Sequence, residues 1–366
     1  MSGDIYATPR IATVQAAPVF MNRDATIDKM EALTKEAKEN GADLVVFPEA
    51  FIPTFPTWCL VLAPIDQHSL FERLYKNSII CPSPAFYKLG EIARKYKIFL
   101  SVGINEKSKE SMGAMWNTNV LFDREGKLLN KHRKLLPTWA EKLVWSFGDG
   151  SGLRVVETEI GRIGALICGE NTNTLARYSM IAQGEQIHIA SYPPAWPIKR
   201  ASKTASGGYP IADVIRVRTA AHSFEAKVFS VASSGYLDEE AIQECSLGDP
   251  DTADFLRNTA RPPSMIINPE GQLEGDEPIL QGEGICYADI DINKEISLKG
   301  VHDIVGAYQR FDIFQVNINR TPFAPARFYD YQKDQRPPMP YVDGALVETF
   351  ASNLACPADL EDEKEE

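Results

Sequence analysis

The fold follows most directly from Arg162-Ile163-Gly164-Ala165-Leu166-Ile167-Cys168-Gly169-Glu170-Asn171. The apolar run from Ile163 to Ile167 is typical of a buried strand. Residues 171–174, Asn-Thr-Asn-Thr, are of the kind that begins helices. Cys168 is therefore predicted where a buried strand gives way to a helix, near backbone N–H groups without helical partners. Such groups stabilise a thiolate, so Cys168 is a candidate nucleophile. The alternative is a small buried hydrophobic residue at a strand end.

The composition of the 366 residues, 44% hydrophobic and 24% charged, is typical of a globular protein with a core of its own. No apolar run reaches the roughly 18 residues that a membrane-spanning helix needs. The first residues lack the pattern of a secretory signal. The six cysteines form no CxxC pair, which favours a reducing compartment. We therefore expect a cytoplasmic protein without a membrane partner.

The net charge is −12, and part of it is concentrated at the C-terminus. Residues 359–366 carry six acids and one lysine, and we expect this tail to be solvated and disordered. Nucleic acid is disfavoured as a partner because its binding requires a basic surface that neutralises phosphates.

The pattern of apolar residues predicts both strands and helices along the chain. Strands are expected at residues 11–16, 44–47, 98–102, 119–122, 127–129, 155–158, 163–167, 186–190, 228–232, 265–267 and 284–291. Helices are expected at about 24–40, 86–96, 174–182 and 211–224, the first capped by Asp24 and ended by Gly41. Strands alternate with helices and hairpins are interspersed, which favours an α/β layered fold with a mixed sheet.

The domain organisation is expected to be simple, because no shift of composition marks a linker. We assign residues 1–300 to one catalytic domain. Residues 301–366 are irregular and rich in proline and aromatic residues, and we expect a C-terminal extension that ends in the acidic tail.

Two further residues are candidates for chemistry beside Cys168. Glu49 follows the predicted strand 44–47, and Lys134 stands just before Leu135-Leu136-Pro137. A cysteine nucleophile needs a base for its proton and a positive charge to offset the one that develops on the substrate. A carboxylate and a lysine supply these functions. The alternatives are a surface acid for Glu49 and a solvated basic run for Lys134.

Three stretches resemble the nitrilase branch of the carbon–nitrogen hydrolase (nitrilase) superfamily, in the family's order. They are Gly41-Ala-Asp-Leu-Val-Val-Phe-Pro-Glu49, Lys131-His-Arg-Lys-Leu-Leu-Pro-Thr138 and Gly161-Arg-Ile-Gly-Ala-Leu-Ile-Cys-Gly-Glu-Asn171. The similarity runs from about residue 10 to 320. It places the family's Glu–Lys–Cys triad on Glu49, Lys134 and Cys168, and its second glutamate on Glu141.

The resemblance implies a four-layer α-β-β-α sandwich with mixed sheets, no cofactor, and homo-oligomers built from dimers that often extend into spirals. It also implies hydrolysis of an organic nitrile to the carboxylic acid and ammonia through a cysteine thioimidate and an acyl-enzyme, with some amide if the thiol leaves first. An amidase or carbamoylase of the same superfamily is the alternative. A non-catalytic assembly protein with this fold is a more distant one.

Three positions beside the expected site depart from the usual family pattern. Gly169 stands where nitrile-cleaving members usually carry Trp, and Trp139 where many relatives carry His. Thr54-Phe55-Pro56 replaces the usual Gly-Tyr-Pro. These departures leave open the preferred nitrile and the ratio of acid to amide. We expect Gly169 to lie beside the substrate. The aromatic residues expected to line its pocket, with core packing as the alternative, are Trp58, Trp139, Tyr192 and Trp196.

The histidines are weaker candidates. His188 and His222 lie in apolar stretches and are expected to be hydrogen-bonded core or surface residues. We expect His132 to be a surface residue, with tuning of the neighbouring Lys134 as the alternative. No HExxH motif or paired CxxC indicates a metal site.

Overall fold

The structure is a computed structural model that describes residues 4–198 and 209–326. The strands are β1 (Arg10–Gln15), β2 (Leu44–Val46), β3 (Phe99–Lys107), β4 (Met115–Phe122), β5 (Leu128–Arg133), β6 (Val156–Thr158), β7 (Gly161–Ile167), β8 (Ile187–Tyr192), β9 (Phe229–Ser234), β10 (Met265–Ile267) and β11 (Gly284–Asp289). The helices are α1 (Arg23–Glu39), α2 (His68–Asn77), α3 (Pro84–Tyr96), α4 (Thr174–Ile181), α5 (Ile211–Ala226), α6 (Glu239–Ser246), α7 (Pro250–Arg257) and α8 (Asn293–Val301). Short 3₁₀ helices include η1 (Thr57–Leu60), η3 (Trp139–Leu143) and η5 (Cys168–Thr172).

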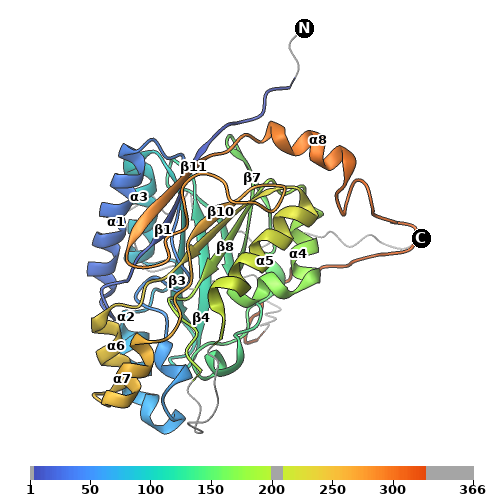
Figure 1. The fold of residues 1–366 in the computed structure, drawn as a ribbon. Coiled ribbons are helices and arrows are strands. Elements are labelled where there is room, and N and C mark those ends of the chain that lie inside the picture. The colour runs from blue at the N-terminus through green and yellow to red at the C-terminus, as the bar shows by residue number, and fades with distance from the viewer. Residues whose placement is uncertain (1–3, 199–208, 327–366) are drawn as a thin grey trace, which may run out of the picture. The chain divides into compact units, whose positions relative to one another are not determined.

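Two mixed sheets pack face to face between two layers of helices (Figure 1). One sheet has the order β11-β1-β2-β3-β4-β5 and is covered by α1 and α3. The other has the order β10-β9-β8-β7-β6 and is covered by α4 and α5. An apolar core between the sheets joins residues such as Leu44 and Val46 to Ile163, Ile187 and Val231. The expected four-layer α-β-β-α sandwich is confirmed.

The strand directions explain why distant residues meet. β1, β2 and β3 are parallel, and β4 is antiparallel to both β3 and β5, so β5 runs in the same direction as β2. In the second sheet β7, β8 and β9 are parallel. The backbone N–H of Glu49, after β2, donates to the carbonyl oxygen of Tyr192, at the end of β8, over 3.3 Å. The carboxyl ends of strands from both sheets therefore lie together, where α/β proteins commonly bind ligands.

Every strand and helix expected from the sequence is present, with boundary shifts of a few residues. The first helix is capped by Asn22, whose side chain accepts from the Ala25 N–H, and not by Asp24, which lies in the first turn. The sequence interpretation missed α2, α6, α7 and α8. These helices have only eight to ten residues, and two or three turns give too little periodicity to detect.

The described residues up to Pro322 form one compact unit. The acidic tail at 359–366 lies outside the described residues. Within the described part of the chain, every helix is too short or too polar to cross a membrane.

Candidate active site

Glu49 lies in the loop that follows β2, and it is 1% exposed. The loop packs directly on β3 at Gly103, where an added Cβ would lie 2.3 Å from the Pro48 carbonyl oxygen and 2.4 Å from the Ala50 nitrogen. Only glycine permits this approach. Ala50 itself has a φ of 48°, a conformation that non-glycine residues seldom adopt and that is often found at functional sites. The surface alternative for Glu49 is therefore wrong.

Lys134 follows β5 and is 1% exposed, so the solvated alternative is wrong as well. Its Nζ lies 2.7 Å from Glu49 Oε1 and 2.7 Å from Glu141 Oε2. Asn117 on β4 donates from Nδ2 to Glu49 Oε1 over 2.7 Å, and the Thr138 N–H donates to Glu141 Oε2 over 2.7 Å. One buried ammonium thus holds two buried carboxylates in a fixed arrangement.

Cys168 is the first residue of η5, directly after β7, and it has a φ of 49°. The side chain of Asn171 stabilises this turn because its Nδ2 donates to the carbonyl oxygens of Leu166 and Cys168, at 3.3 and 3.1 Å. A residue held in a left-handed conformation between a strand and a helix presents its side chain at a sharp turn, as nucleophiles of other hydrolases do.

Glu170 connects the cysteine turn to the lysine segment, and the sequence interpretation gave it no role. Its carboxylate accepts from the backbone N–H groups of Leu135 and Ile167, at 2.6 and 2.7 Å. It also lies 2.9 Å from Nε2 of His132, which is fully buried, so the surface assignment of His132 is wrong. The signal in the sequence was an acid beside the cysteine, but two of its three partners, Leu135 and His132, lie more than thirty residues away.

The protonation states fit a base and a protonated thiol. Burial raises the pKa of Glu49, and the Glu141 charge adds to this against the opposing Lys134 charge, giving a value of about 7. Burial and the Glu49 charge raise the pKa of the Cys168 thiol well above its usual range. The sequence predicted that free N–H groups would stabilise a resting thiolate at Cys168. Burial and the Glu49 charge outweigh that effect, and the resting thiol is protonated. Glu49, Lys134 and Glu141 are close enough to Cys168 for their charges to affect the pKa of its thiol.

Two oxygens of the site are unused by the described residues. Glu49 Oε2 and Glu141 Oε1 are buried and accept no hydrogen bond from them. Lys134 and Asn117 occupy only Oε1 of Glu49. The geometry therefore leaves one Glu49 oxygen to take a proton or to orient a water molecule.

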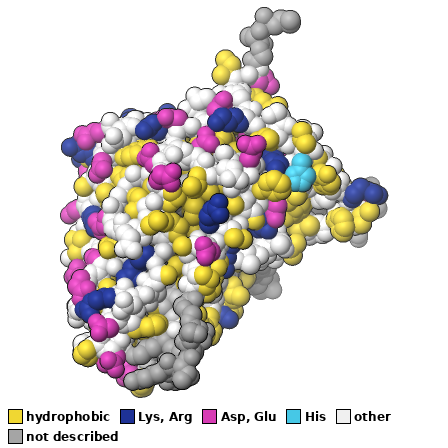
Figure 2. Space-filling model, viewed as in Figure 1, with side chains coloured by type: hydrophobic (Ala, Val, Ile, Leu, Met, Phe, Trp, Pro, Cys, Tyr) yellow, Lys and Arg dark blue, Asp and Glu magenta, His cyan; other side chains and the backbone are white. Residues whose placement is uncertain are grey.

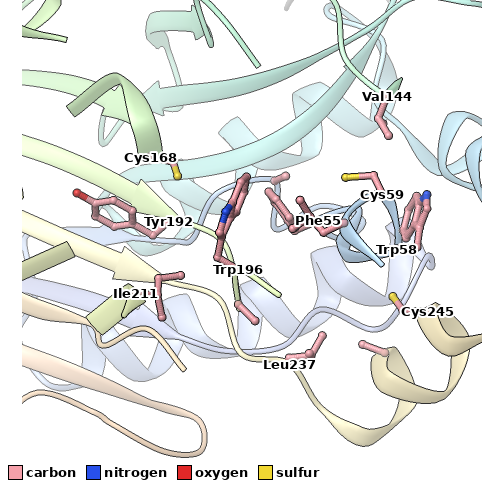
Figure 3. Packing of buried hydrophobic residues seen from close by; sticks show 14 of the residues in the cluster. Phe55, Trp58, Cys59, Val144, Cys168, Tyr192, Trp196, Ile211, Leu237 and Cys245 are labelled. Carbon is pink, nitrogen blue, oxygen red and sulfur yellow. The ribbon is translucent and has the colours of Figure 1, made fainter. Parts of the chain in front are cut away.

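A cavity of about 190 Å³ opens onto Cys168. Its walls include Thr138, Trp139, Gly169, Tyr192 and Trp196. In Figure 3, Tyr192 and Trp196 lie on the Cys168 side of the cluster, whereas Trp58 lies beyond Phe55 and Cys59.

Comparison with known proteins decides the family. Residues 10–299 match the model of the family described as carbon-nitrogen hydrolase. The chain belongs to the carbon–nitrogen hydrolase family. A nitrilase from Paraburkholderia phymatum is 34% identical over 86% of this chain and 88% of its own. An aliphatic nitrilase from Rhodococcus rhodochrous is 33% identical over 87% and 84%, and a bifunctional nitrilase/nitrile hydratase from Lupinus angustifolius is 33% identical over 90% and 91%.

Solved structures show the same carbon–nitrogen hydrolase fold. An amidase from Nesterenkonia sp. superimposes with a TM-score of 0.57 over 80% of this chain and 97% of its own, at 17% identity. At this identity the likeness concerns the fold alone.

The aromatic residues of this carbon–nitrogen hydrolase divide into two groups. Trp139, Tyr192 and Trp196 line the cavity. Trp58 is fully buried elsewhere, with its ring 6.3 Å from that of Phe20, and the core alternative describes it. Gly169 faces the cavity, and a Cβ there would lie 3.0 Å from the Thr138 hydroxyl oxygen.

One buried cluster behind the cysteine turn has the composition of a metal site. Ligand atoms of Glu185, His188 and His222 lie within 4.8 Å of one another. These atoms already form hydrogen bonds, at 2.8 Å between His188 and Glu185 and 2.7 Å between His222 and Glu185. His188 also lies 2.8 Å from Oδ1 of Asn171, which supports the turn at Cys168. The cluster is thus explained as a hydrogen-bond network in the core, as expected for both histidines.

The pKa of Glu49 gives a testable pH dependence. Below about pH 7 Glu49 is protonated and cannot accept the Cys168 proton, so kcat/KM should fall as pH decreases through that value. We expect a limb with an apparent pKa near 7 when kcat/KM for an uncharged substrate is measured between about pH 5 and 9. Circular dichroism at each pH controls for unfolding. A profile that is flat between about pH 5.5 and 8.5 would contradict the assignment of Glu49 as the base.

Proposed function

We propose that this chain is a nitrilase that hydrolyses an organic nitrile to the carboxylic acid and ammonia. The observation that carries the proposal is the buried Glu49–Lys134–Glu141 set beside Cys168 at a cavity of small-molecule size. The nitrilases to which the chain is similar over most of its length support the substrate class.

In the proposed mechanism, Glu49 takes the proton of Cys168 through its free Oε2, and the thiolate attacks the nitrile carbon. The nitrile nitrogen becomes anionic and receives that proton, which gives a thioimidate. The Lys134 ammonium and the N–H of Gly169 in the first turn of η5 stabilise the charge while it develops.

Water then attacks the thioimidate, oriented by Glu49 and by the free oxygen of Glu141. Loss of ammonia from the tetrahedral intermediate leaves an acyl-enzyme, and a second water releases the acid. If the Cys168 thiol leaves first, the product is the amide. The position of the positive charge on the intermediate decides which group leaves.

A panel of nitriles and their corresponding amides, with ammonia and both products quantified, tests the proposal. We expect ammonia and acid from at least one nitrile with a kcat/KM above that of the corresponding amide. Turnover of amides or carbamoyl compounds with no turnover of any nitrile would replace the proposal by the amidase or carbamoylase alternative.

Gly169 is expected to set the size of the accepted nitrile and the partition between acid and amide. An indole at this position would enter the cavity and press on Thr138, because even a Cβ comes within 3.0 Å of that hydroxyl. We expect Gly169→Trp to lower kcat/KM for bulky nitriles about tenfold relative to small ones, an effect of the size of lost pocket contacts. The acid-to-amide ratio should change as well. Unchanged ratios and size preference would remove Gly169 from the substrate site.

We propose that the chain forms homo-oligomers built from dimers. Large hydrophobic side chains are exposed on the outer helices, among them Leu175, Val217 and Phe224 at 60, 66 and 47%. Figure 2 shows hydrophobic side chains recurring between mixed charges on one face. Light scattering should give a molar mass of at least twice the 40.7 kDa of one chain. Val217→Lys should lower that mass, whereas Leu280→Lys should leave it unchanged. A monomer of unaltered protein would end this proposal.

Two further features complete the proposal. The catalytic domain comprises residues 1–300 and the rest is an extension, which is supported by a family match ending at residue 299 and by α8 ending at Val301. The location is cytoplasmic, which is supported by free thiols at every described cysteine. These are Cys59, Cys81, Cys168, Cys245 and Cys286.

A further inference from the structure

One wall of the cavity at Cys168 is formed by residues of α5 and by Tyr209, which precedes the helix. Ile211, Ile215 and Arg218 are four and three residues apart on α5, so they lie on one face of the helix, and all three line the cavity. Tyr209 lines it as well. The wall therefore combines apolar surface with one guanidinium.

Arg218 is exceptional among the described residues that line this cavity, because it alone is charged. The other lining residues are aromatic, aliphatic or small. Glu49, Lys134 and Glu141 lie behind the cavity and neutralise one another in part through two contacts of 2.7 Å. Arg218 therefore supplies the only formal charge among the described residues that line the cavity, and that charge is positive.

The Arg218 guanidinium has no acidic partner among residues 4–198 and 209–326. Its one hydrogen bond there runs from Nη2 to the Tyr209 hydroxyl oxygen over 3.3 Å. Arg177 on the neighbouring helix α4 shows the usual alternative, an ion pair of 2.6 Å with Glu225. A partly buried guanidinium without a counter-ion, beside a hydroxyl that can donate, is suited to binding an anion.

We propose that the cavity binds nitriles that carry a carboxylate, with the Arg218 guanidinium and the Tyr209 hydroxyl binding the carboxylate while Cys168 attacks the nitrile carbon. The inference rests on the proposed function and narrows it to one substrate class. A guanidinium binds a carboxylate through two parallel hydrogen bonds, and the apolar walls strengthen them by excluding water. The cavity of about 190 Å³ limits the substrate to a short one.

A competing role for Arg218 is purely electrostatic. Its charge lowers the pKa of the Cys168 thiol, against the effects of burial and of Glu49. Loss of that effect would slow every nitrile alike, whereas loss of a carboxylate site slows only charged substrates. The two roles therefore separate when a charged and an uncharged substrate of the same shape are compared.

The kinetic test uses straight-chain ω-cyano carboxylates with one to four methylene groups, each paired with the nitrile in which an isopropyl group replaces the carboxylate. We expect the unaltered enzyme to prefer the best carboxylate over its uncharged partner at least tenfold in kcat/KM. Arg218→Gln should abolish this preference mainly by raising KM for the carboxylate. Arg216→Gln removes the same charge from an exposed position on α5 and should preserve it. Equal losses for both substrates in Arg218→Gln, or no preference in the unaltered enzyme, would overturn the inference.

Binding measured without turnover separates this inference from the proposed function. Calorimetry of Cys168→Ala with the same ω-cyano carboxylates should show binding that is at least tenfold weaker in Cys168→Ala/Arg218→Gln. Arg218-dependent binding without turnover of any nitrile by the unaltered enzyme would refute the nitrilase function and retain the anion site. Turnover of uncharged nitriles together with Arg218-independent binding would refute the anion site and retain the function.

Discussion

Replacing Cys168 by alanine is expected to lower kcat/KM for nitriles by about 10⁴-fold or more, the loss seen when a hydrolase loses its nucleophile. The reason is that Cys168 carries the only thiol among the described residues that line the cavity. Thr138 lines the cavity, but an unactivated hydroxyl is a far weaker nucleophile than a thiolate. The measurement is steady-state release of ammonia from the best nitrile of the panel.

Cys245→Ala is the matched control for this variant. Cys245 is another fully buried cysteine, and it lies on α6 outside the cavity. Cys245→Ala should lower the stability somewhat through lost packing, and its kcat/KM should stay within about threefold of the unaltered enzyme's. Thermal unfolding shows whether the Cys168→Ala protein is folded. Retention of nitrile turnover by folded Cys168→Ala would contradict the assignment of the nucleophile.

Lys134→Met is expected to have the second largest effect, acting on activity and on stability. The change leaves Glu49 and Glu141 buried beside one another with no cation between them. We expect a loss of about 3 kcal/mol in the free energy of unfolding near neutral pH, the usual consequence of removing one partner from a buried ion pair. We expect kcat/KM to fall by about 10³-fold, because the charge on the nitrile nitrogen is no longer offset.

The sign of the pH dependence provides a further check on Lys134→Met. The Lys134 charge lowers the pKa of Glu49, so without the ammonium that pKa rises further and Glu49 takes up a proton at mildly acidic pH. The stability deficit of the variant should therefore be smaller at about pH 5 than at pH 8. Chemical denaturation of both proteins at the two pH values measures this difference, and a deficit that grows on acidification would contradict the account.

A double variant separates charge from packing at the lysine. Lys134→Met/Glu141→Gln removes one carboxylate along with the ammonium, so it should recover part of the stability and none of the activity. Lys131→Met serves as the control, since Lys131 lies three residues before Lys134, on β5, but is partly exposed and paired with Glu106. Recovery of turnover in the double variant would show that Lys134 acts only through stability.

The fold and the three central residues of the candidate site could be predicted because their signals are local. Apolar runs mark strand ends at Glu49 and Cys168, and parallel strands bring such ends together. The resemblance to the superfamily added Glu141. It also favoured a catalytic Lys134 over an exposed one, which the residues around Lys134 alone do not distinguish.

The remaining features depend on contacts between distant residues. Glu170 could not be given a role because two of its partners are distant in sequence. His132 lies on β5, in the other sheet, and Leu135 follows that strand. The raised pKa of Cys168 could not be foreseen, since burial and the Glu49 charge outweigh the local N–H groups that the sequence emphasised. Arg218 was not predicted as a site residue from the sequence. What distinguishes it is the lack of an acidic partner among the described residues, which only the structure shows.

Intact-protein and peptide mass spectrometry of enzyme quenched during nitrile turnover tests the central claim most directly. The account predicts a mass increase that corresponds to the thioimidate or acyl group, confined to the peptide that contains Cys168 and absent from Cys168→Ala. An adduct on any other residue, or steady turnover by a fully unmodified enzyme that resists trapping under single-turnover conditions, would contradict it.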